Sequence, residues 1–235
     1  MKFITTSWDD GAPYDMRLAE LLTKYNLRGT FYIPKTNQEH EVMNENDILQ
    51  LSKHFEIGGH TLNHKNLKTS TEEIICKEVY GSFNWIKDLT NTAPSSFCLP
   101  FGEYSKKSLE IIYNAGYHFI RTTELLSVEK NIFPFATTMQ VYEHNRFVYL
   151  KHLLKRKRIN NLMFWMKNGC KKKLPGLLEI YLKNIDDHGG CFHLWGHSWE
   201  IEEFKLWDSL ELILQKISGL SDFRYVNNKE LVFLG

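Results

Sequence analysis

The stretch Phe3-Ile4-Thr5-Thr6-Ser7-Trp8-Asp9-Asp10-Gly11 decides the fold, because it places a β-strand directly before a turn and a helix. Residues 3–8 are mostly β-branched or aromatic, which favours a strand, and the Asp-Asp-Gly that follows favours a turn. Pro13 suits the first turn of a helix. Apolar residues then recur on one helical face, at Leu18, Leu21, Leu22 and Tyr25. The sequence therefore predicts a strand, a loop and a helix in succession.

Strand and helix signals alternate along almost the whole sequence. Ser70 and Glu73 form a capping-box pattern at the start of one predicted helix, and Gly116 follows the end of another. Further strands are predicted at 29–33, 55–59, 96–100, 117–121, 191–196 and 223–226, and the run 133–142 has room for one more. Short strands separated by helices predict an α/β fold in which a parallel sheet is closed, or nearly closed, into a barrel. We expect a single domain over residues 1–235.

Composition excludes several classes of protein. Hydrophobic residues make up 43% of the chain and charged residues 24%, as in globular proteins. The net charge of +1 gives no general attraction for nucleic acid, which we do not expect as a partner. The first residues leave no room for a signal segment, and no stretch reaches 18 apolar residues, so a cytoplasmic location is expected.

Two histidines four residues apart, His60 and His64, follow a glycine pair at the end of the third predicted strand. Two neutral imidazoles and one carboxylate can hold a divalent ion while leaving positions open for water and substrate. Asp9 and Asp10 end the first strand, on the same edge of a parallel sheet. Adjacent side chains of a strand point to opposite faces, so one aspartate can bind the ion while the other reaches the attacking water.

Three stretches together resemble the motifs of the polysaccharide deacetylase (NodB-homology) family of carbohydrate esterases: residues 7–11 (SWDDG), 60–64 (HTLNH) and 99–102 (LPFG). The resemblance extends over nearly the whole chain. It implies a distorted (β/α)7-type barrel. It also implies Zn²⁺ or another divalent ion such as Co²⁺, Ni²⁺ or Mn²⁺, and hydrolysis of an acyl group from nitrogen on a sugar.

The resemblance also implies roles for single residues. Asp9 would be the general base, and the backbone N–H of Phe101 would face the oxyanion. Pro100 and Phe101 would line the substrate groove. The implied metal ligands are Asp10, His60 and His64.

Two positions depart from the family pattern. Cys98 stands where the family commonly has an arginine that orients the catalytic aspartate, and Arg121, at the end of the fifth predicted strand, is the best replacement. A solvated or purely structural arginine is the competing interpretation. We group Arg121 with Pro100, Phe101 and Trp199 as substrate-binding residues, and Trp199 is placed to stack on a sugar or to pack the barrel.

The second departure concerns the general acid, which in the family is a histidine on a late strand. Here that strand carries two histidines. We assign His197, since it ends the strand and its His-Ser-Trp-Glu resembles the His-Pro-Trp-Glu of a subset of the family. His193 would lie one layer deeper on the same strand face. Glu200 could fix the tautomer of His197 or cap the next helix, and both interpretations stay open.

A basic helical segment, at about residues 147–174, interrupts the pattern. Between Lys151 and Lys173 there are nine lysines or arginines and no acid, with Phe164 and Trp165 among them. A solvated helical face explains this composition. So does a surface that meets an anionic membrane or a diphosphate-bearing substrate.

The predicted function is a metal-dependent hydrolase that removes the N-acetyl group from an N-acetylated sugar in a glycan, or in a nucleotide-linked or lipid-linked precursor. Two alternatives remain. The same centre could hydrolyse a cyclic imide or ureide, or the barrel could bind glycan without turnover.

Overall fold

One sheet of eight parallel strands forms the centre of the computed structural model, which describes residues 1–130, 132–155 and 158–233. The strand order is β5-β4-β3-β2-β1-β7-β6, and β8 also pairs with β1. The strands are β1 (Lys2–Asp9), β2 (Thr30–Ile33), β3 (Glu56–Gly59), β4 (Ser96–Cys98), β5 (Phe119–Arg121), β6 (Met139–Gln140), β7 (Gly190–His197) and β8 (Arg224–Tyr225).

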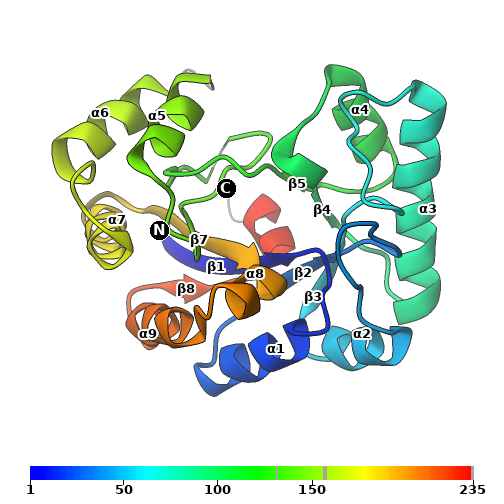
Figure 1. Ribbon diagram of the computed structural model, residues 1–235, viewed down its shortest axis with the longest axis horizontal. Helices are drawn as coiled ribbons and strands as arrows, with labels where there is room; N and C mark the ends of the chain where they lie inside the picture. Colours follow the sequence, from blue (N-terminus) through cyan, green and yellow to red (C-terminus); the bar gives the residue numbers. More distant parts are fainter. Residues whose placement is uncertain (131, 156–157, 234–235) are drawn as a thin grey trace.

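Helices surround the sheet on its outer side (Figure 1). Apolar faces of α1, α7 and α9 bury their leucines and isoleucines against the sheet, as their spacing predicts. The helices are α1 (Asp15–Lys24), α2 (Glu45–Ser52), α3 (Glu72–Thr90), α4 (Lys106–Asn114), α5 (Arg146–Lys155), α6 (Ile159–Asn168), α7 (Leu174–His188), α8 (Ser198–Glu203) and α9 (Trp207–Ile217), with 3₁₀ turns η1 (Pro100–Gly102) and η2 (Asn228–Phe233).

The first strand is the centre of the sheet. β1 pairs with β7 along its whole length, from Lys2 opposite Gly190 to Asp9 opposite His197. On its other edge β8 pairs with the first half of β1 and β2 with the second half. Because all pairings are parallel, the carboxyl ends of the strands meet at one end of the sheet.

The sheet curls until its two outer strands nearly meet. The Phe135 carbonyl, in the loop before β6, accepts a hydrogen bond at 2.9 Å from the Thr122 N–H just after β5, and the Phe135 N–H donates at 2.8 Å to the Ile120 carbonyl within β5. This single bridge takes the place of a ladder between β5 and β6 in the described residues. The architecture is the distorted (β/α)7-type barrel that the sequence predicts.

The ends of several elements differ from the predictions. Thr71, not Ser70, caps α3 by accepting a hydrogen bond from the Ile74 N–H, while the Ser70 hydroxyl donates to the Asn66 carbonyl instead. Only residues 139–140 of the run 133–142 form a strand. The fourth strand ends at Cys98, because Leu99 is followed by the η1 turn.

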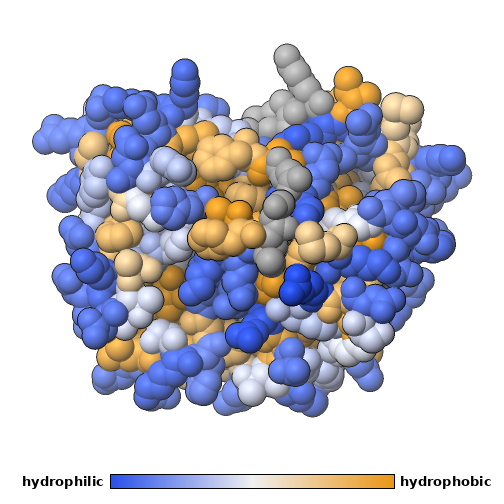
Figure 2. Space-filling model, turned by 180° about the vertical axis from the view of Figure 1, so that it is seen from behind, coloured by the Kyte–Doolittle hydropathy of each residue, from blue (hydrophilic) through white to orange (hydrophobic). Residues whose placement is uncertain are grey.

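The basic segment is divided into two helices, α5 and α6, followed by the start of α7. Arg156 and Lys157, which contribute to its predicted charge, lie outside the described residues. In the described part of the chain, no helix is both long and apolar enough to cross a bilayer. Figure 2 shows a face on which hydrophilic residues predominate, with apolar residues in separate groups between them.

Polar side chains fill part of the barrel interior and bond to one another. Ser7 Oγ lies 2.8 Å from His193 Nε2, and the Thr5 hydroxyl donates to Asn228 Oδ1 at 2.8 Å. The Asn228 amide donates in turn to the Tyr32 hydroxyl at 2.7 Å. These hydrogen bonds satisfy groups that burial would otherwise destabilise, and they fix the register of β1 beneath the site.

Candidate active site

A pocket of about 390 Å³ opens at the carboxyl ends of the strands. It brings together residues that the sequence places in four separate loops. Of the predicted site residues, its lining contains Asp9, Asp10, His60, His64, Phe101, His197 and Trp199. Pro100 and Arg121 are buried and do not line it.

Asp10, His60 and His64 converge on one point. Asp10 Oδ1 lies 3.3 Å from His60 Nε2 and 3.2 Å from His64 Nε2, and it accepts no hydrogen bond from any described residue. Burial raises the pKa of Asp10, but contacts with the two imidazoles outweigh it and bring the pKa below its ordinary value. A buried, ionised carboxylate oxygen facing two ring nitrogens fits a divalent cation.

The backbone around these ligands is shaped to present them. His60 Nδ1 lies 2.9 Å from the Cys98 carbonyl, so Nδ1 carries the proton there and Nε2 keeps its lone pair for a cation. Gly58 and Gly59 end β3 and directly precede His60. A Cβ at Gly58 would lie 2.5 Å from the Tyr32 ring, and one at Gly59 would lie 2.4 Å from the Tyr117 hydroxyl. Any side chain there would push β3 away and displace the histidine.

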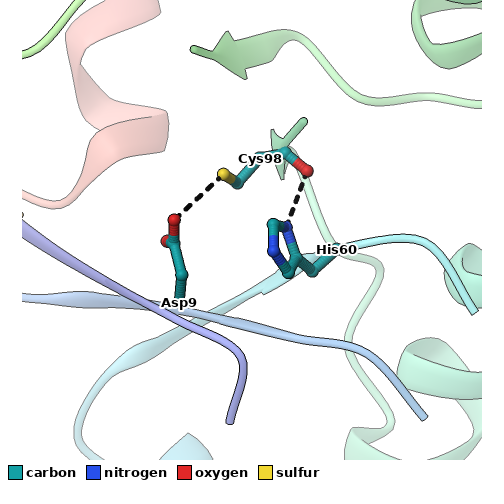
Figure 3. A group of neighbouring side chains, drawn as sticks. All are labelled: Asp9, His60 and Cys98. Carbon is teal, nitrogen blue, oxygen red and sulfur yellow. Dashed lines mark hydrogen bonds between the residues drawn. The ribbon is translucent and has the colours of Figure 1, made fainter. Parts of the chain in front are cut away.

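Asp9 is held by two buried partners. Arg121 Nη2 donates to Asp9 Oδ1, and the Cys98 thiol donates to Asp9 Oδ2 at 3.4 Å. Figure 3 shows the Cys98 thiol directed at Asp9 while its carbonyl faces His60. Burial raises the pKa of Cys98 well above its ordinary value, so it is present as the thiol. Cys98 is therefore a hydrogen-bond donor to Asp9.

Asp9, His60 and Cys98 form a second group with metal-ligand spacing. The neutral thiol and the arginine on Asp9 make this group the poorer cation site. Burial lowers the pKa of Arg121, but the charge and hydrogen bond of Asp9, together with Cys98 and Tyr32, outweigh it and raise the pKa. Arg121 is fully buried between the rings of Tyr32 and Trp195. It can act on a substrate only through Asp9.

The two late histidines lie in different surroundings. His193 is buried against Ser7, and burial together with the charge of Arg121 lowers its pKa well below the ordinary value. His197 lines the pocket, with Nε2 3.9 Å from Asp10 Oδ2 and Nδ1 3.3 Å from Glu200 Oε2. Burial lowers the pKa of His197, but the bond to Glu200 and the nearby aspartates outweigh it and raise the pKa.

Two residues that sequence reasoning missed continue this network. Gln140 Nε2 donates to Glu200 Oε2 at 2.9 Å, and Gln140 Oε1 lies 2.6 Å from His144 Nε2. Gln140 ends the short strand β6 next to β7. Gln140 lies within the run 133–142, which has room for a strand. A polar residue at the end of that strand is the signal that could have identified it.

Trp199 has a role that its sequence position did not reveal. Its indole Nε1 donates to Asp10 Oδ2 at 2.9 Å, on the other oxygen from the one that faces the histidines. His40 stacks on the indole with ring centroids 3.8 Å apart. One face of the ring is therefore covered, and the indole is anchored to the carboxylate.

Phe101 also lines the pocket, next to His64. Its φ of 61° places it in the left-handed region, and its ring packs against His64 with centroids 5.0 Å apart. The next residue, Gly102, also has a positive φ, and a Cβ there would lie 2.1 Å from Thr123 Oγ1. The turn therefore depends on the glycine to hold Phe101 at the pocket.

Comparison with known proteins gives the same family as the motifs. The family model described as polysaccharide deacetylase matches residues 1–120. A peptidoglycan deacetylase of Helicobacter pylori is 29% identical over 107 residues, which cover 44% of this chain and 34% of the relative. The chain thus matches about a third of that protein's length.

Two solved structures share the fold. A putative polysaccharide deacetylase from Mycobacterium smegmatis is 13% identical with a TM-score of 0.69, over 99% of this chain and 90% of the other. A family 4 acetyl xylan esterase from Clostridium thermocellum, in complex with a cobalt ion, is 16% identical with a TM-score of 0.61, over 99% and 91%. With the family model matching half of the sequence, this chain belongs to the polysaccharide deacetylase family.

Proposed function

We propose that the chain is a metal-dependent N-deacetylase that hydrolyses the acetamide of an N-acetylated sugar. The observation that carries the proposal is the convergence of Asp10, His60 and His64 in a pocket that also contains Asp9 and His197. The set combines a candidate cation site with two candidate acid–base groups in the same pocket. The family membership supports the same reaction class.

Asp10, His60 and His64 would hold the ion, for which Zn²⁺ is our first choice and Co²⁺, Ni²⁺ or Mn²⁺ are alternatives. A bound divalent ion lowers the pKa of water toward ~7 and polarises a carbonyl. Two imidazoles and one carboxylate are a common donor set of catalytic zinc. The cobalt ion in the solved esterase supports a divalent ion of this size.

The proton transfers fall to the chain's own residues. Asp9, fixed by Arg121 and Cys98, takes a proton from the attacking water. The Phe101 N–H donates to the oxyanion as the carbonyl becomes tetrahedral. His197, whose pKa is raised by Glu200 and the aspartates, donates a proton to the leaving amine. Arg121 thereby replaces the arginine that the family usually has at the position of Cys98.

The substrate we propose is a sugar in a glycan, or in a nucleotide-linked or lipid-linked precursor. A cytoplasmic location and membrane contact by residues 151–173 stay predictions. Ile159, Met163 and Met166 form an exposed apolar stripe along α6, which is the surface that such contact would use. Salt-sensitive flotation with anionic liposomes tests it, and absence of flotation at low salt would remove the idea.

Metal analysis and an acetate-release assay test the proposed function together. Purified protein should contain about one divalent ion per chain, and chelation should abolish acetate release from a panel of N-acetylated sugars. A parallel panel of cyclic imides and ureides tests the alternative substrate class. Activity that survives complete metal removal would refute the proposal. Tight metal binding without turnover on either panel would favour the glycan-binding barrel.

A further inference from the structure

A second cavity, of about 420 Å³, adjoins the active-site pocket and shares His144 with it. It lies between the start of α5 and the loop that joins α6 to α7. Arg146 contributes from α5, and Lys171, Lys172 and Lys173 contribute from the loop. The two cavities are therefore neighbours at His144.

The charge of this wall is strongly positive. Four cationic side chains stand against one carboxylate, Glu143, so the lining carries an excess of three positive charges. Among the described residues none of the four cations forms an ion pair, and burial lowers the pKa of His144, which favours its neutral form. The cavity attracts anions and has little internal compensation.

Two further features of the wall offer donors without acceptors. Trp165 is 4% exposed, lines the cavity, and has an indole N–H that meets no acceptor in the described part of the chain. Lys173 is the N-cap of α7 and makes no side-chain cap, so the positive end of a 15-residue helix lies at the cavity. An oxygen-rich anion suits these surroundings.

We propose that this cavity binds a phosphoryl group of the substrate, and that the enzyme acts on phosphorylated N-acetyl sugars. The inference rests on the proposed N-deacetylase function and narrows its substrate class. The phosphate or diphosphate lies among Arg146 and Lys171–173, and the acetamide reaches the pocket of Asp10, His60 and His64. Lysines and a helix N-terminus bind phosphate by charge and by N–H donation.

Matched substrates and matched variants test the proposal. N-acetylglucosamine 1-phosphate and N-acetylglucosamine are compared by acetate release in wild type and in the variant Lys171→Gln/Lys172→Gln/Lys173→Gln. The control Lys53→Gln/Lys77→Gln/Lys87→Gln removes the same charge from exposed lysines far from the cavity. Binding of inorganic pyrophosphate to metal-free protein is measured by calorimetry in all three.

Three exposed charge contacts should together give about a tenfold preference in kcat/KM for the phosphorylated sugar. The cavity variant should lose this preference and the pyrophosphate binding, while its rate on the neutral sugar stays unchanged. The control variant should keep both the preference and the pyrophosphate binding. An equal loss of preference and of pyrophosphate binding in the control variant would refute the proposed phosphate site. Pyrophosphate binding without substrate preference would show a free-anion site and overturn the substrate assignment. If neither sugar is cleaved, the N-deacetylase proposal fails on its own, and absent pyrophosphate binding still refutes the cavity.

Discussion

Replacing Trp199 with phenylalanine should weaken metal binding without emptying the pocket. The substitution removes the indole N–H that donates to Asp10 Oδ2 at 2.9 Å and keeps an aromatic ring that can stack on His40. Asp10 Oδ1 still faces both histidines. The substitution removes only the hydrogen bond to Asp10 Oδ2, which fixes the orientation and charge of the carboxylate.

The size of the effect follows from the geometry. A hydrogen bond to an ionised acceptor contributes about 1.5–3 kcal/mol, and Asp10 is buried, so water cannot easily replace the lost donor. This range corresponds to about a 10- to 150-fold change in affinity. Loss of such an outer donor typically weakens metal binding by about 10- to 100-fold. We therefore expect the metal Kd to rise by about 10- to 100-fold.

Chelator competition measures the metal Kd directly and needs no substrate. Trp207→Phe is the matched control, because its indole donates to Glu202 at 2.6 Å and neither residue lines the pocket. The control should bind metal as wild type does, and the Tm of both metal-free variants should be compared. An unchanged Kd in Trp199→Phe, with the ring still packed, would refute the role of the indole.

Three further predictions concern the acid–base groups. Asp9→Asn should keep the metal but lower kcat by about 10²- to 10⁴-fold, and metal analysis with acetate release checks both. His197→Ala should also bind metal and lose turnover, whereas His193→Gln should lower the Tm and leave kcat nearly unchanged, because His193 bonds to Ser7 away from the pocket; the reverse pattern would exchange their roles. A general acid must be protonated, so kcat should fall as pH rises through the raised pKa of His197. Glu200→Gln removes a partner that raises this pKa and should move the alkaline limb of the pH–rate profile to lower pH; an unmoved limb would remove Glu200 from this role.

Local patterns were enough to predict the barrel and the convergence of Asp10, His60 and His64. The strand before Asp9 and the glycine pair before His60 can each be recognised from a few consecutive residues. Parallel pairing then brings their ends together through β2, where Tyr32 lies opposite both Asp9 and Gly58. The sequence does not identify Thr71 as the cap of α3, because Ser70 beside it is also a favourable cap residue, and in the structure the Ser70 hydroxyl donates to the Asn66 carbonyl instead.

Contacts between distant buried groups could not be predicted from pattern. The family resemblance suggested Arg121 as the replacement for the arginine that orients Asp9, but the contact depends on the register of β5 beside β4. The donor role of Cys98 depends on the same register. The chain from His197 through Glu200 and Gln140 to His144 needs β6 beside β7, and β6 is only two residues long.

The position of β1 at the centre of the sheet has a consequence for how the chain is made. During synthesis β1 emerges first, yet its full-length partner β7 begins at Gly190 and β8 at Arg224. The strand that carries Asp9 must wait, unpaired along the whole edge that β7 occupies and along half of the other edge, until these late strands are available. Such distant pairing makes folding slow and leaves an apolar strand open to association with other chains. Truncation after β6 would therefore yield an insoluble chain, although every proposed metal ligand would still be present.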